Sequence, residues 1–421
     1  MRTGIGWLRL DLDFRKNWYD KVFICLILVS LVLRAMWLDR PLDFLIFDEQ
    51  YYVNVARNIL GLPHLGIYED TPSGIDPNPE HPPLAKLMIA LSMRVLGDNA
   101  WGWRIPSVIF GCLALLLFYL LIKKASKKPA LALVSAFLFS FDNLILVHSR
   151  IATLDIFLLA FILLGFYWYF SGRMALSAAS LALGTLCKMT GILGFGTLVA
   201  YHFLRDVYRS KAEGLRVNWW KKIRWLGYYT YFYGLPFLGL LTVFDRFWGT
   251  YSNPFAHLTY IYTYTSTLTC PSPTGIQSYP WQWLINEVQI PYLTVTGDVY
   301  ANGQFLRTEV LVAFTGAMNP FIIYLSIPTM IYSAYKYFSK GDEFALFLMT
   351  WFICTYSPSY PMAIIGHRIM YLFYFLITLP SVCAAIGYLY TDQKRLIVLM
   401  GSYIVLVIIG FIVQFPFRTI P

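Results

Sequence analysis

Residues 22–50 read VFICLILVSLVLRAMWLDRPLDFLIFDEQ. The apolar run 22–38 follows a basic stretch that ends at Lys21, which is the charge pattern of a membrane anchor with a cytoplasmic N-terminal side. The acidic pair Asp48 and Glu49 comes soon afterwards, at the start of a loop that faces away from the cytoplasm. Two carboxylates at a membrane surface favour general-base chemistry on a substrate that is itself held in the membrane.

The composition is that of an integral membrane protein. Of the 421 residues, 58% are hydrophobic and only 13% are charged, whereas soluble domains carry about a quarter charged residues. Basic residues gather in two groups between apolar runs, at 123–128 and 205–224, as the positive-inside rule produces for cytoplasmic loops. The net charge of +10 therefore indicates contact with membrane lipids, and no nucleic acid partner is expected.

Apolar runs recur along the whole chain, and we expect about 11 membrane-spanning helices in an all-α fold. The runs lie at residues 22–38, 104–122, 129–147, 156–171, 174–188, 190–204, 226–244, 310–335, 344–360, 369–390 and 396–415. With alternating orientation, both basic groups fall on the cytoplasmic side, so the helix count and the charge bias agree.

Two long loops fall on the outer side of this single multi-pass domain, residues 1–421. The loop 39–103 carries the acidic pair, and we expect two amphipathic helices in it along the membrane surface, at 50–60 and 84–96. The loop 245–308 is rich in Tyr, Trp, Thr and Pro. Long ordered loops are usually functional, so both are candidates for a site.

Polar residues gather at the outer ends of the expected helices. Besides the acidic pair they are His81, Lys86, Arg104, His148, Arg150, Asp155, Lys188, His367 and Arg368. Ordinary structural roles exist for single members: Asp155 could cap a helix, and Arg104 or Arg368 could extend to lipid phosphates. Because acids, histidines and cations meet at one membrane boundary, a functional site is favoured.

These side chains suit the transfer of a sugar from a lipid phosphate. Arg and Lys residues at head-group level can bind a phosphate on a lipid, and a carboxylate opposite them can deprotonate an incoming hydroxyl. A transporter or flippase is the alternative from another class, because charges within membranes often mark ion paths. The enzyme is favoured because the charges lie at one face and the sequence shows no inverted repeat.

Several short motifs follow one another in a recognisable order. They are Phe47-Asp48-Glu49, His81-Pro82-Pro83-Leu84-Ala85-Lys86, Trp103-Arg104-Ile105-Pro106-Ser107, the run from His148 to Asp155, Cys187-Lys188-Met189-Thr190, and Tyr279-Pro280-Trp281-Gln282-Trp283. In this order they resemble the protein O-mannosyltransferase family, within the GT-C group of polyprenyl-phosphate-sugar-dependent glycosyltransferases. The last third of the chain matches that family mainly by topology and by His367-Arg368.

The resemblance implies a GT-C fold and an inverting reaction. Mannose would pass from a dolichyl or other polyprenyl phosphate to a Ser or Thr hydroxyl of a protein, on the extracytoplasmic face of the cell membrane. The family pattern implies Asp48 as the general base, with Glu49 beside it, and Arg104 at the lipid phosphate.

The roles of the other matching residues stay open. His81, Lys86, Arg150, Asp155, Lys188, His367 and Arg368 match positions for the donor phosphate or sugar. The aromatic residues Tyr279, Trp281 and Trp283 are expected on the acceptor side, although an aromatic belt at the membrane interface would also explain them.

Some features depart from the family pattern. The loop 245–308 is too short for the β-trefoil domain of the fungal and animal enzymes, which indicates a prokaryotic member, archaeal or bacterial. Lys188-Met189 replaces the more usual Lys-Trp, and the acidic pair before a Tyr-rich helix also resembles the lipid A aminoarabinose transferases. Another sugar, or a lipid or glycan acceptor, is therefore the main alternative within the group.

No cofactor is implied with certainty. Asp48 and Glu49 could hold a divalent cation, but no His or Asp ligands at metal spacing accompany them in the sequence.

Overall fold

The computed structural model describes residues 18–40, 44–63, 66–393 and 395–415. Most of the basic stretch before the first apolar run, including Arg15 and Lys16, lies outside these residues. The elements are α1 Trp18–Ala35, α2 Glu49–Leu60, α3 Leu84–Leu96, α4 Ala100–Ser126, α5 Pro129–Ser140, α6 Asn143–His148, α7 Asp155–Phe170, α8 Met174–Cys187, the 3-10 helix η1 Met189–Gly191, α9 Ile192–Ala212, α10 Trp219–Phe247, α11 Pro254–Thr267, α12 Pro280–Leu284, β1 Ile290–Ala301, β2 Gln304–Gly316, α13 Pro320–Ile323, α14 Ser326–Lys340, α15 Glu343–Tyr356, α16 Ser359–Ile364, the 3-10 helix η2 Leu372–Ile377, α17 Leu379–Asp392 and α18 Ile397–Gln414.

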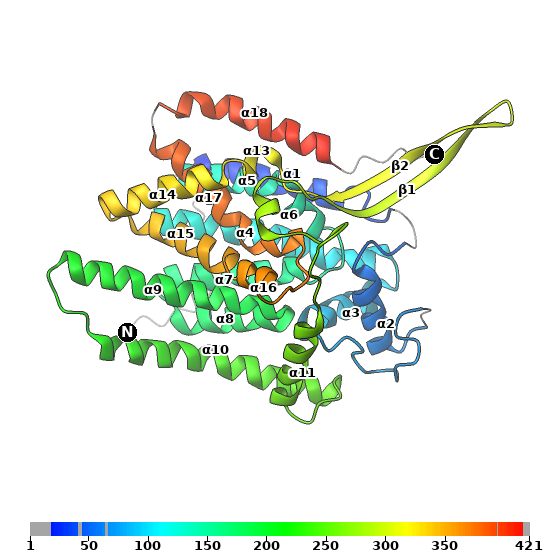
Figure 1. Ribbon diagram of the computed structural model, residues 1–421, viewed down its shortest axis with the longest axis horizontal. Coiled ribbons are helices and arrows are strands. Elements are labelled where there is room, and N and C mark those ends of the chain that lie inside the picture. The colour runs from blue at the N-terminus through cyan, green and yellow to red at the C-terminus, as the bar shows by residue number, and fades with distance from the viewer. Residues whose placement is uncertain (1–17, 41–43, 64–65, 394, 416–421) are drawn as a thin grey trace.

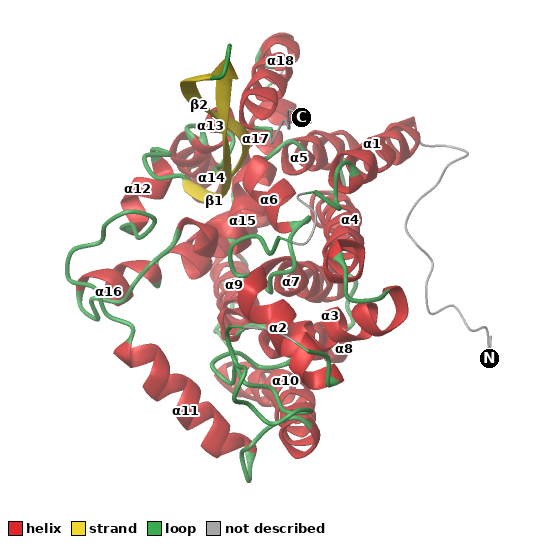
Figure 2. Ribbon diagram, turned by 90° about the vertical axis from the view of Figure 1, so that its right-hand side faces the viewer, coloured by secondary structure: helices red, strands yellow, loops and turns green. Residues whose placement is uncertain are grey.

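The long helices form one bundle around α7 (Figures 1 and 2). The sequence of α7 is apolar on every side, and nearly all of its side chains are buried against its neighbours, chiefly α4 and α8. A helix without a polar face is stable only where other elements surround it. The apolar composition of residues 155–170 therefore places α7 at the centre of the bundle.

The two ends of the bundle differ in character (Figure 1). Helices α2, α3 and α11 lie at one end, and the basic connection between α9 and α10 lies at the other. The amphipathic helices expected at 50–60 and 84–96 are α2 and α3, and each packs a face on the bundle through residues such as Val53 and Ile89. The candidate residues for chemistry belong to the end that carries α2 and α3.

The all-α prediction is wrong for residues 290–316. There β1 and β2 form an antiparallel hairpin that projects from the bundle (Figure 1). Its turn is Asn302-Gly303, with φ of +52° and +77°, as a two-residue type I′ turn requires. The helix expected at 310–335 therefore does not exist as one element, because β2 continues to Gly316 and α14 begins at Ser326.

Two other apolar runs are interrupted. The run 129–147 divides into α5 and α6, because the carboxylate of Asp142 caps the second helix by accepting from the Ile145 N–H at 3.1 Å. The run 369–390 is regular α-helix only from Leu379, and the 3-10 helix η2 precedes it. Apolar composition located these segments but did not reveal the breaks within them.

The number of membrane crossings stays a prediction. Within the described part of the chain, α4 alone is both long and apolar enough to cross a bilayer by itself, whereas α5, α7, α8 and residues 398–414 are apolar but shorter. Short helices can still contribute to a membrane domain when their ends and loops complete the span.

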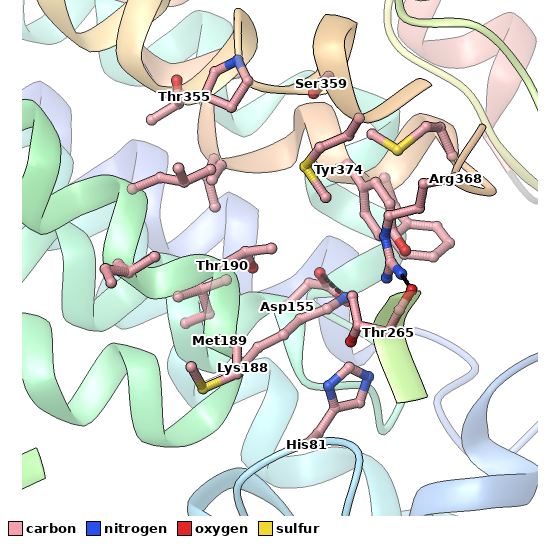
Figure 3. Close-up of a pocket in the computed structure, with 18 of the residues that line it drawn as sticks. His81, Asp155, Lys188, Met189, Thr190, Thr265, Thr355, Ser359, Arg368 and Tyr374 are labelled. Atoms are coloured by element: carbon pink, nitrogen blue, oxygen red, sulfur yellow. Dashed lines mark hydrogen bonds and ion pairs between the residues drawn. The ribbon is translucent and has the colours of Figure 1, made fainter. Parts of the chain in front are cut away.

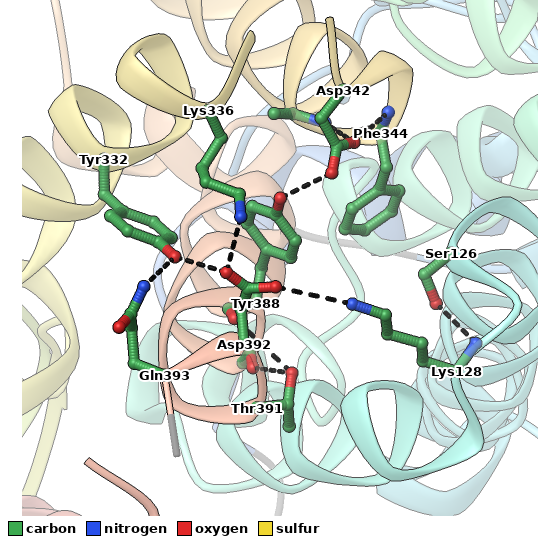
Figure 4. A network of polar contacts seen from close by, with 12 residues as sticks. Ser126, Lys128, Tyr332, Lys336, Asp342, Phe344, Tyr388, Thr391, Asp392 and Gln393 are labelled. Carbon is green, nitrogen blue, oxygen red and sulfur yellow. Dashed lines mark hydrogen bonds and ion pairs between the residues drawn. The ribbon is translucent and has the colours of Figure 1, made fainter. Parts of the chain in front are cut away.

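A polar network joins several helices at the end opposite α2 and α3 (Figure 4). Asp392 of α17 accepts from Lys336 Nζ at 2.7 Å and from the Tyr332 hydroxyl at 2.5 Å, both on α14. Tyr388 of α17 donates to Asp342, just before α15, at 2.6 Å. The network fixes the ends of three helices far from the candidate site, so we assign it a structural role.

Candidate active site

A strained turn presents the acidic pair. Phe47 has a φ of +54°, in the left-handed region that bulky residues rarely occupy, and such strain costs on the order of 1–3 kcal/mol. Its ring packs on Tyr292 of β1, with centroids 4.4 Å apart, and on Phe373 of η2 at 6.0 Å. These contacts hold the turn that places Asp48 and Glu49 at the start of α2.

Glu49 and Arg104 form a buried ion pair. The Arg104 Nε and Nη2 donate to the two carboxylate oxygens of Glu49 at 2.9 and 2.8 Å, and both side chains are almost fully buried. Glu49 also accepts from the backbone N–H groups of Ile46 at 2.7 Å and Ala152 at 2.9 Å. The pair thus joins α2, α4 and the segment before α7.

Arg104 directs its remaining donors at the protein as well. Its Nη1 donates to the Leu38 carbonyl at 2.8 Å and its Nη2 to the Phe44 carbonyl at 2.9 Å. The structure places neither Arg104 nor Glu49 in the wall of the cavity described below. Because their polar atoms are bonded within the protein, both residues stabilise the framework of the site. The predicted roles of Arg104 in donor binding and of Glu49 in catalysis stay predictions.

A cavity of about 250 Å³ opens close to this framework (Figure 3). Its polar lining comes from distant parts of the chain and comprises Glu80, His81, Asp155, Lys188, Thr190, Thr265, Thr355, Ser359, Arg368 and Tyr374. The remainder is mainly apolar, with Leu158, Met189, Ile192, Leu193, Ile261, Pro358, Met362, Met370, Phe373 and Ile377. A cavity with a few polar groups and a large apolar wall suits an amphiphilic ligand.

Lys188 and Asp155 form the central ion pair of the wall. The Lys188 Nζ lies 2.7 Å from Asp155 Oδ1, and it faces the ring of Phe373 at 4.9 Å. Lys188 can take this position because α8 ends at Cys187 and the chain turns sharply to Gly191. A Cβ at Gly191 would lie 2.5 Å from the Thr185 backbone nitrogen, so only glycine fits this turn.

His148 contacts the Lys188–Asp155 pair on the side away from the cavity. Its Nε2 hydrogen-bonds the Tyr292 hydroxyl at 2.7 Å, and its Nδ1 lies 3.2 Å from the Thr153 hydroxyl and 3.8 Å from Asp155 Oδ2. His148 is buried and does not line the cavity. The geometry makes it a neighbour that orients Asp155 and connects it to the hairpin.

Asp48 lies beside this pair. Its carboxylate forms no hydrogen bond or ion pair with any residue that the structure describes, and it does not cap α2. Burial raises the pKa of Asp48 to about 7, while Lys188 lowers it and Asp155 raises it further. An uncommitted carboxylate with a pKa near neutrality can accept a proton from an approaching hydroxyl.

The loop before α3 has two residues with different positions. Lys86 is buried, and its Nζ binds Asp76 at 2.5 Å and the His81 carbonyl at 2.8 Å, so it holds the loop together and does not line the cavity. His81 does line the cavity, and its Nδ1 is buried with no partner among the described residues. Burial, followed by the charges of Lys188, Lys86 and Arg368, lowers the pKa of His81 well below its usual value. His81 is therefore neutral.

Arg368 lines the cavity, whereas Arg150 and His367 do not. Arg368 donates to the Thr265 carbonyl, and its buried Nε has no partner among the described residues. Arg150 donates to carbonyls at the end of α1, at 3.2 Å for Leu33. His367 is exposed. Of the residues predicted for the donor, the structure brings His81, Asp155, Lys188 and Arg368 together.

The aromatic segment 279–283 has two faces. Tyr279 and Trp281 stack with ring centroids 4.3 Å apart, and Trp281 is 41% exposed. Trp283 is fully buried and its Nε1 donates to the Ser278 hydroxyl at 2.9 Å. Only the stacked pair is therefore open to an acceptor.

Substitutions separate these two roles. We expect Trp283→Phe to destabilise the protein by about 1–3 kcal/mol, because the buried Ser278 hydroxyl loses its donor. Trp281→Ala should leave stability within about 0.5 kcal/mol and raise the acceptor KM. Thermal unfolding and acceptor titrations measure both effects. An unchanged acceptor KM for Trp281→Ala would remove this surface from acceptor recognition.

The sequence pattern missed several polar lining residues, namely Glu80, Thr265, Thr355, Ser359 and Tyr374. Glu80 immediately precedes His81, so its place beside a motif was the available signal. Thr265 and Tyr374 had no such signal, because an isolated Thr or Tyr in an aromatic-rich loop is common in a membrane protein. In the part of the chain that the structure describes, no group of three or more His, Cys, Asp or Glu side chains is placed to hold a metal ion.

Parts of this chain resemble known proteins. Residues 80–217, which contain most of the cavity motifs, match the family described as dolichyl-phosphate-mannose-protein mannosyltransferase. This segment is thus similar to the protein O-mannosyltransferase family. The polyprenol-phosphate-mannose–protein mannosyltransferase of Corynebacterium glutamicum is 34% identical over 122 residues, which cover 28% of this chain and 23% of that protein.

A second relative represents the aminoarabinose branch. The undecaprenyl phosphate-α-4-amino-4-deoxy-L-arabinose arabinosyl transferase of Pseudomonas paraeruginosa is 40% identical over 76 residues, or 18% of this chain and 14% of that protein. The mannosyltransferase-family relatives are matched over only about a quarter of their length. The family model thus covers residues 80–217, and most of the length of each relative is unmatched.

The fold likeness extends over almost the whole chain. The protein O-mannosyltransferase Pmt1-Pmt2 complex of S. cerevisiae, solved with its sugar donor, has a TM-score of 0.67 at 11% identity. The alignment covers 95% of this chain and 90% of that chain. At this identity the likeness concerns the fold alone. The expected GT-C fold is confirmed in this helical bundle. The apolar composition and the long apolar helix α4 agree with a membrane protein.

Proposed function

We propose that this protein transfers mannose from a polyprenyl phosphate to a Ser or Thr hydroxyl of a protein. Asp48 accepts the proton of the hydroxyl while the hydroxyl oxygen attacks the anomeric carbon of the sugar. The bond between that carbon and the phosphate oxygen breaks, and its electron pair leaves with the polyprenyl phosphate. Attack opposite the leaving group inverts the anomeric configuration. The uncommitted Asp48 carboxylate beside the Lys188–Asp155 pair carries this proposal.

The cavity has the chemistry of a lipid-phosphate site. Lys188 and Arg368 line it as cations, and the unpartnered Nε of Arg368 is available to a phosphate oxygen. The apolar residues of α9 and of the segment after α15 offer a surface for the first isoprene units. Lys188 is already held by Asp155, so it can stabilise the departing phosphate without rearrangement.

We assign the reaction to the extracytoplasmic face of the cell membrane. The cavity motifs lie at the end of the bundle with α2 and α3, and the basic connection between α9 and α10 lies at the opposite end (Figure 1). Basic connections stay cytoplasmic during insertion. This arrangement supports an outer acceptor, and the partners we propose are a polyprenyl-phosphate sugar, a protein acceptor and the surrounding lipids.

A direct assay tests the reaction. Purified protein is incubated with polyprenyl phosphate mannose and a Ser/Thr-containing peptide, and the peptide is analysed by mass spectrometry. The proposal expects a mass increase of one hexose that requires both substrates. Absence of glycopeptide, with a protein that is folded and binds the donor, would contradict a protein acceptor.

A different sugar or acceptor is the second candidate. The relative from Pseudomonas paraeruginosa is named for an aminoarabinose donor, and it shares the highest local identity among the relatives described above. Replacing mannose by 4-amino-4-deoxyarabinose, and the peptide by a glycolipid, in the same assay distinguishes the two. Transfer only with those substrates would assign the protein to that branch.

The pH dependence follows from Asp48. Because burial places its pKa at about 7, the base is protonated in acid, and kcat/KM should fall about tenfold for each pH unit below that value. Above pH 7 the carboxylate is ionised and the rate should reach a plateau. Initial rates between pH 5 and pH 9, at acceptor concentrations well below KM, test this. A flat profile down to pH 5 would contradict a base with a raised pKa.

A further inference from the structure

Glu80 is the one lining acid without a role in the mechanism above. It lies between Pro79 and His81, it is half-buried, and it lines the same cavity as Lys188 and Arg368. Its side chain interacts with the Tyr264 hydroxyl of α11. Burial raises the pKa of the Glu80 carboxyl above its usual value, whereas Lys86 lowers it. When a ligand displaces water from the cavity, the Glu80 carboxylate therefore needs hydrogen-bond donors from that ligand in addition to Tyr264.

The charge of Glu80 restricts what that partner can be. A carboxylate repels a phosphate, so Glu80 cannot belong to the part of the cavity that receives the anion. Its preferred partners are hydroxyl groups, which donate hydrogen bonds to carboxylate oxygens. The ligand of the proposed reaction carries its hydroxyls on the sugar that is bonded to the phosphate. A carboxylate in the same cavity as two cations therefore matches a ligand with an anionic part and a hydroxyl-rich part.

We propose that Glu80 accepts hydrogen bonds from hydroxyl groups of the donor sugar and so makes donor affinity depend on the sugar. This inference rests on the proposed function, because it takes a sugar on a lipid phosphate as the ligand. It adds a recognition residue that neither the motif pattern nor the proton transfer requires. Glu80 contacts the sugar, and Asp48 contacts the acceptor.

The backbone on both sides of Glu80 is clamped. The Pro79 carbonyl accepts from His257 Nε2 at 2.7 Å, and the His81 carbonyl accepts from Lys86 Nζ at 2.8 Å. His257, on α11, is buried and also bonds Asp245 of α10, with Nδ1 and Oδ1 2.7 Å apart. The backbone position of Glu80 is therefore fixed by the buried side chains of His257 and Lys86. Recognition groups are held in this way when their geometry must exist before the ligand arrives.

Binding measurements test the proposal without relying on turnover. Dissociation constants of purified protein are measured for polyprenyl phosphate mannose and for sugar-free polyprenyl phosphate of the same chain length. We expect Glu80→Ala to weaken the mannose-bearing lipid about 10- to 100-fold and to leave the sugar-free lipid within about twofold. Glu80→Gln should lie between Ala and wild type. Asp70→Asn, an exposed acid of the same loop, serves as the control and should change neither constant.

The clamp supplies a second arm of the experiment. His257→Ala removes the donor to Pro79, so it should reduce the affinity for the mannose-bearing lipid more than that for the sugar-free lipid. His257→Gln retains a donor at a similar reach and should restore most of the loss. His257 is a positioning residue, and rescue by glutamine would separate positioning from a general loss of fold.

Each result decides the proposal. Equal losses for both lipids, or no loss for either, would overturn sugar recognition by Glu80. Unchanged binding with abolished turnover would make Glu80 a proton acceptor and would also overturn it. If the sugar-dependent affinity depends on Glu80 but no sugar reaches a peptide, the recognition stands and the proposed reaction fails.

Discussion

Asp48→Asn is expected to lower turnover by about 10²–10⁴, the usual contribution of a general base. The asparagine keeps the shape of the side chain and removes its ability to take the acceptor proton. Donor affinity should stay within about twofold, because Asp48 does not line the cavity that receives the donor. Rates with saturating donor and acceptor, and a separate donor-binding measurement, test these two statements.

Stability distinguishes this loss from misfolding. The pKa of Asp48 is raised from 3.8 to about 7, so the folded protein binds this proton more tightly than the unfolded chain does. Ionising Asp48 therefore costs stability as the pH rises from 4 to 7, and the cost persists above pH 7. Asp48→Asn should unfold at an equal or higher temperature than wild type at pH 8. Asp70→Asn, in the same loop, should change neither turnover nor stability.

Two results would contradict the assignment. Near-normal turnover of Asp48→Asn would remove Asp48 from the chemistry. A loss of turnover by about 10²–10⁴ in Glu80→Gln would then identify Glu80 as the base. A large fall in unfolding temperature at pH 8 would show that Asp48 is needed for folding. The raised pKa of Asp48 predicts the opposite, an unfolding temperature that is not lowered by this substitution.

Sequence motifs located those site residues whose positions are set by adjacent residues in the chain. The acidic pair, the Lys188 turn and the start of α7 at Asp155 are each defined by adjacent residues, such as the glycine that permits the turn at Gly191. Their assembly also follows from topology, because all three stand at the same end of antiparallel helices. This part of the site was predictable from motifs and helix boundaries.

The partners of Glu49 and Arg104 were not predictable in the same way. The two residues are 55 positions apart, and a cation at a membrane boundary has the same sequence signature whether it binds a phosphate or a buried acid. Only the tertiary structure, which brings the starts of α2 and α4 together, decides between them. The adjacent acids at 48 and 49 thus have opposite surroundings, although the sequence presents them as a pair.

The hairpin β1–β2 was mispredicted for a different reason. Apolar residues at 310–316 were assigned to a membrane helix because average hydrophobicity does not distinguish an extended strand from a helix. The signals for a hairpin were present, since polar residues alternate along 294–298 and Asn302-Gly303 is a strong turn pair. Because the whole chain has the composition of a helical membrane protein, we assigned a helix at 310–316 in spite of these hairpin signals.

Arg104→Ala is expected to destabilise the protein by about 3–5 kcal/mol, because it leaves the fully buried Glu49 carboxylate without its cation. The Leu38 and Phe44 carbonyls also lose their donor. Arg104→Lys keeps the charge but cannot form the paired contact with Glu49, so its stability should lie between alanine and wild type. Unfolding temperatures in detergent without any donor measure the effect, and Arg94→Ala, on the exposed side of α3, is the control.

Unfolding temperatures measured without donor distinguish a structural role of Arg104 from a role in donor binding. A residue that binds only the lipid phosphate would leave the unfolding temperature of the free protein unchanged and would raise the donor KM. If Arg104 mainly pairs with Glu49, Arg104→Ala should lower the unfolding temperature of the free protein. Reduced activity would then follow from that loss of stability. Glu49→Gln should show the same loss of stability, since it removes the charge that Arg104 pairs with. Normal stability for both variants, with weakened donor use by Arg104→Ala alone, would return Arg104 to the donor site.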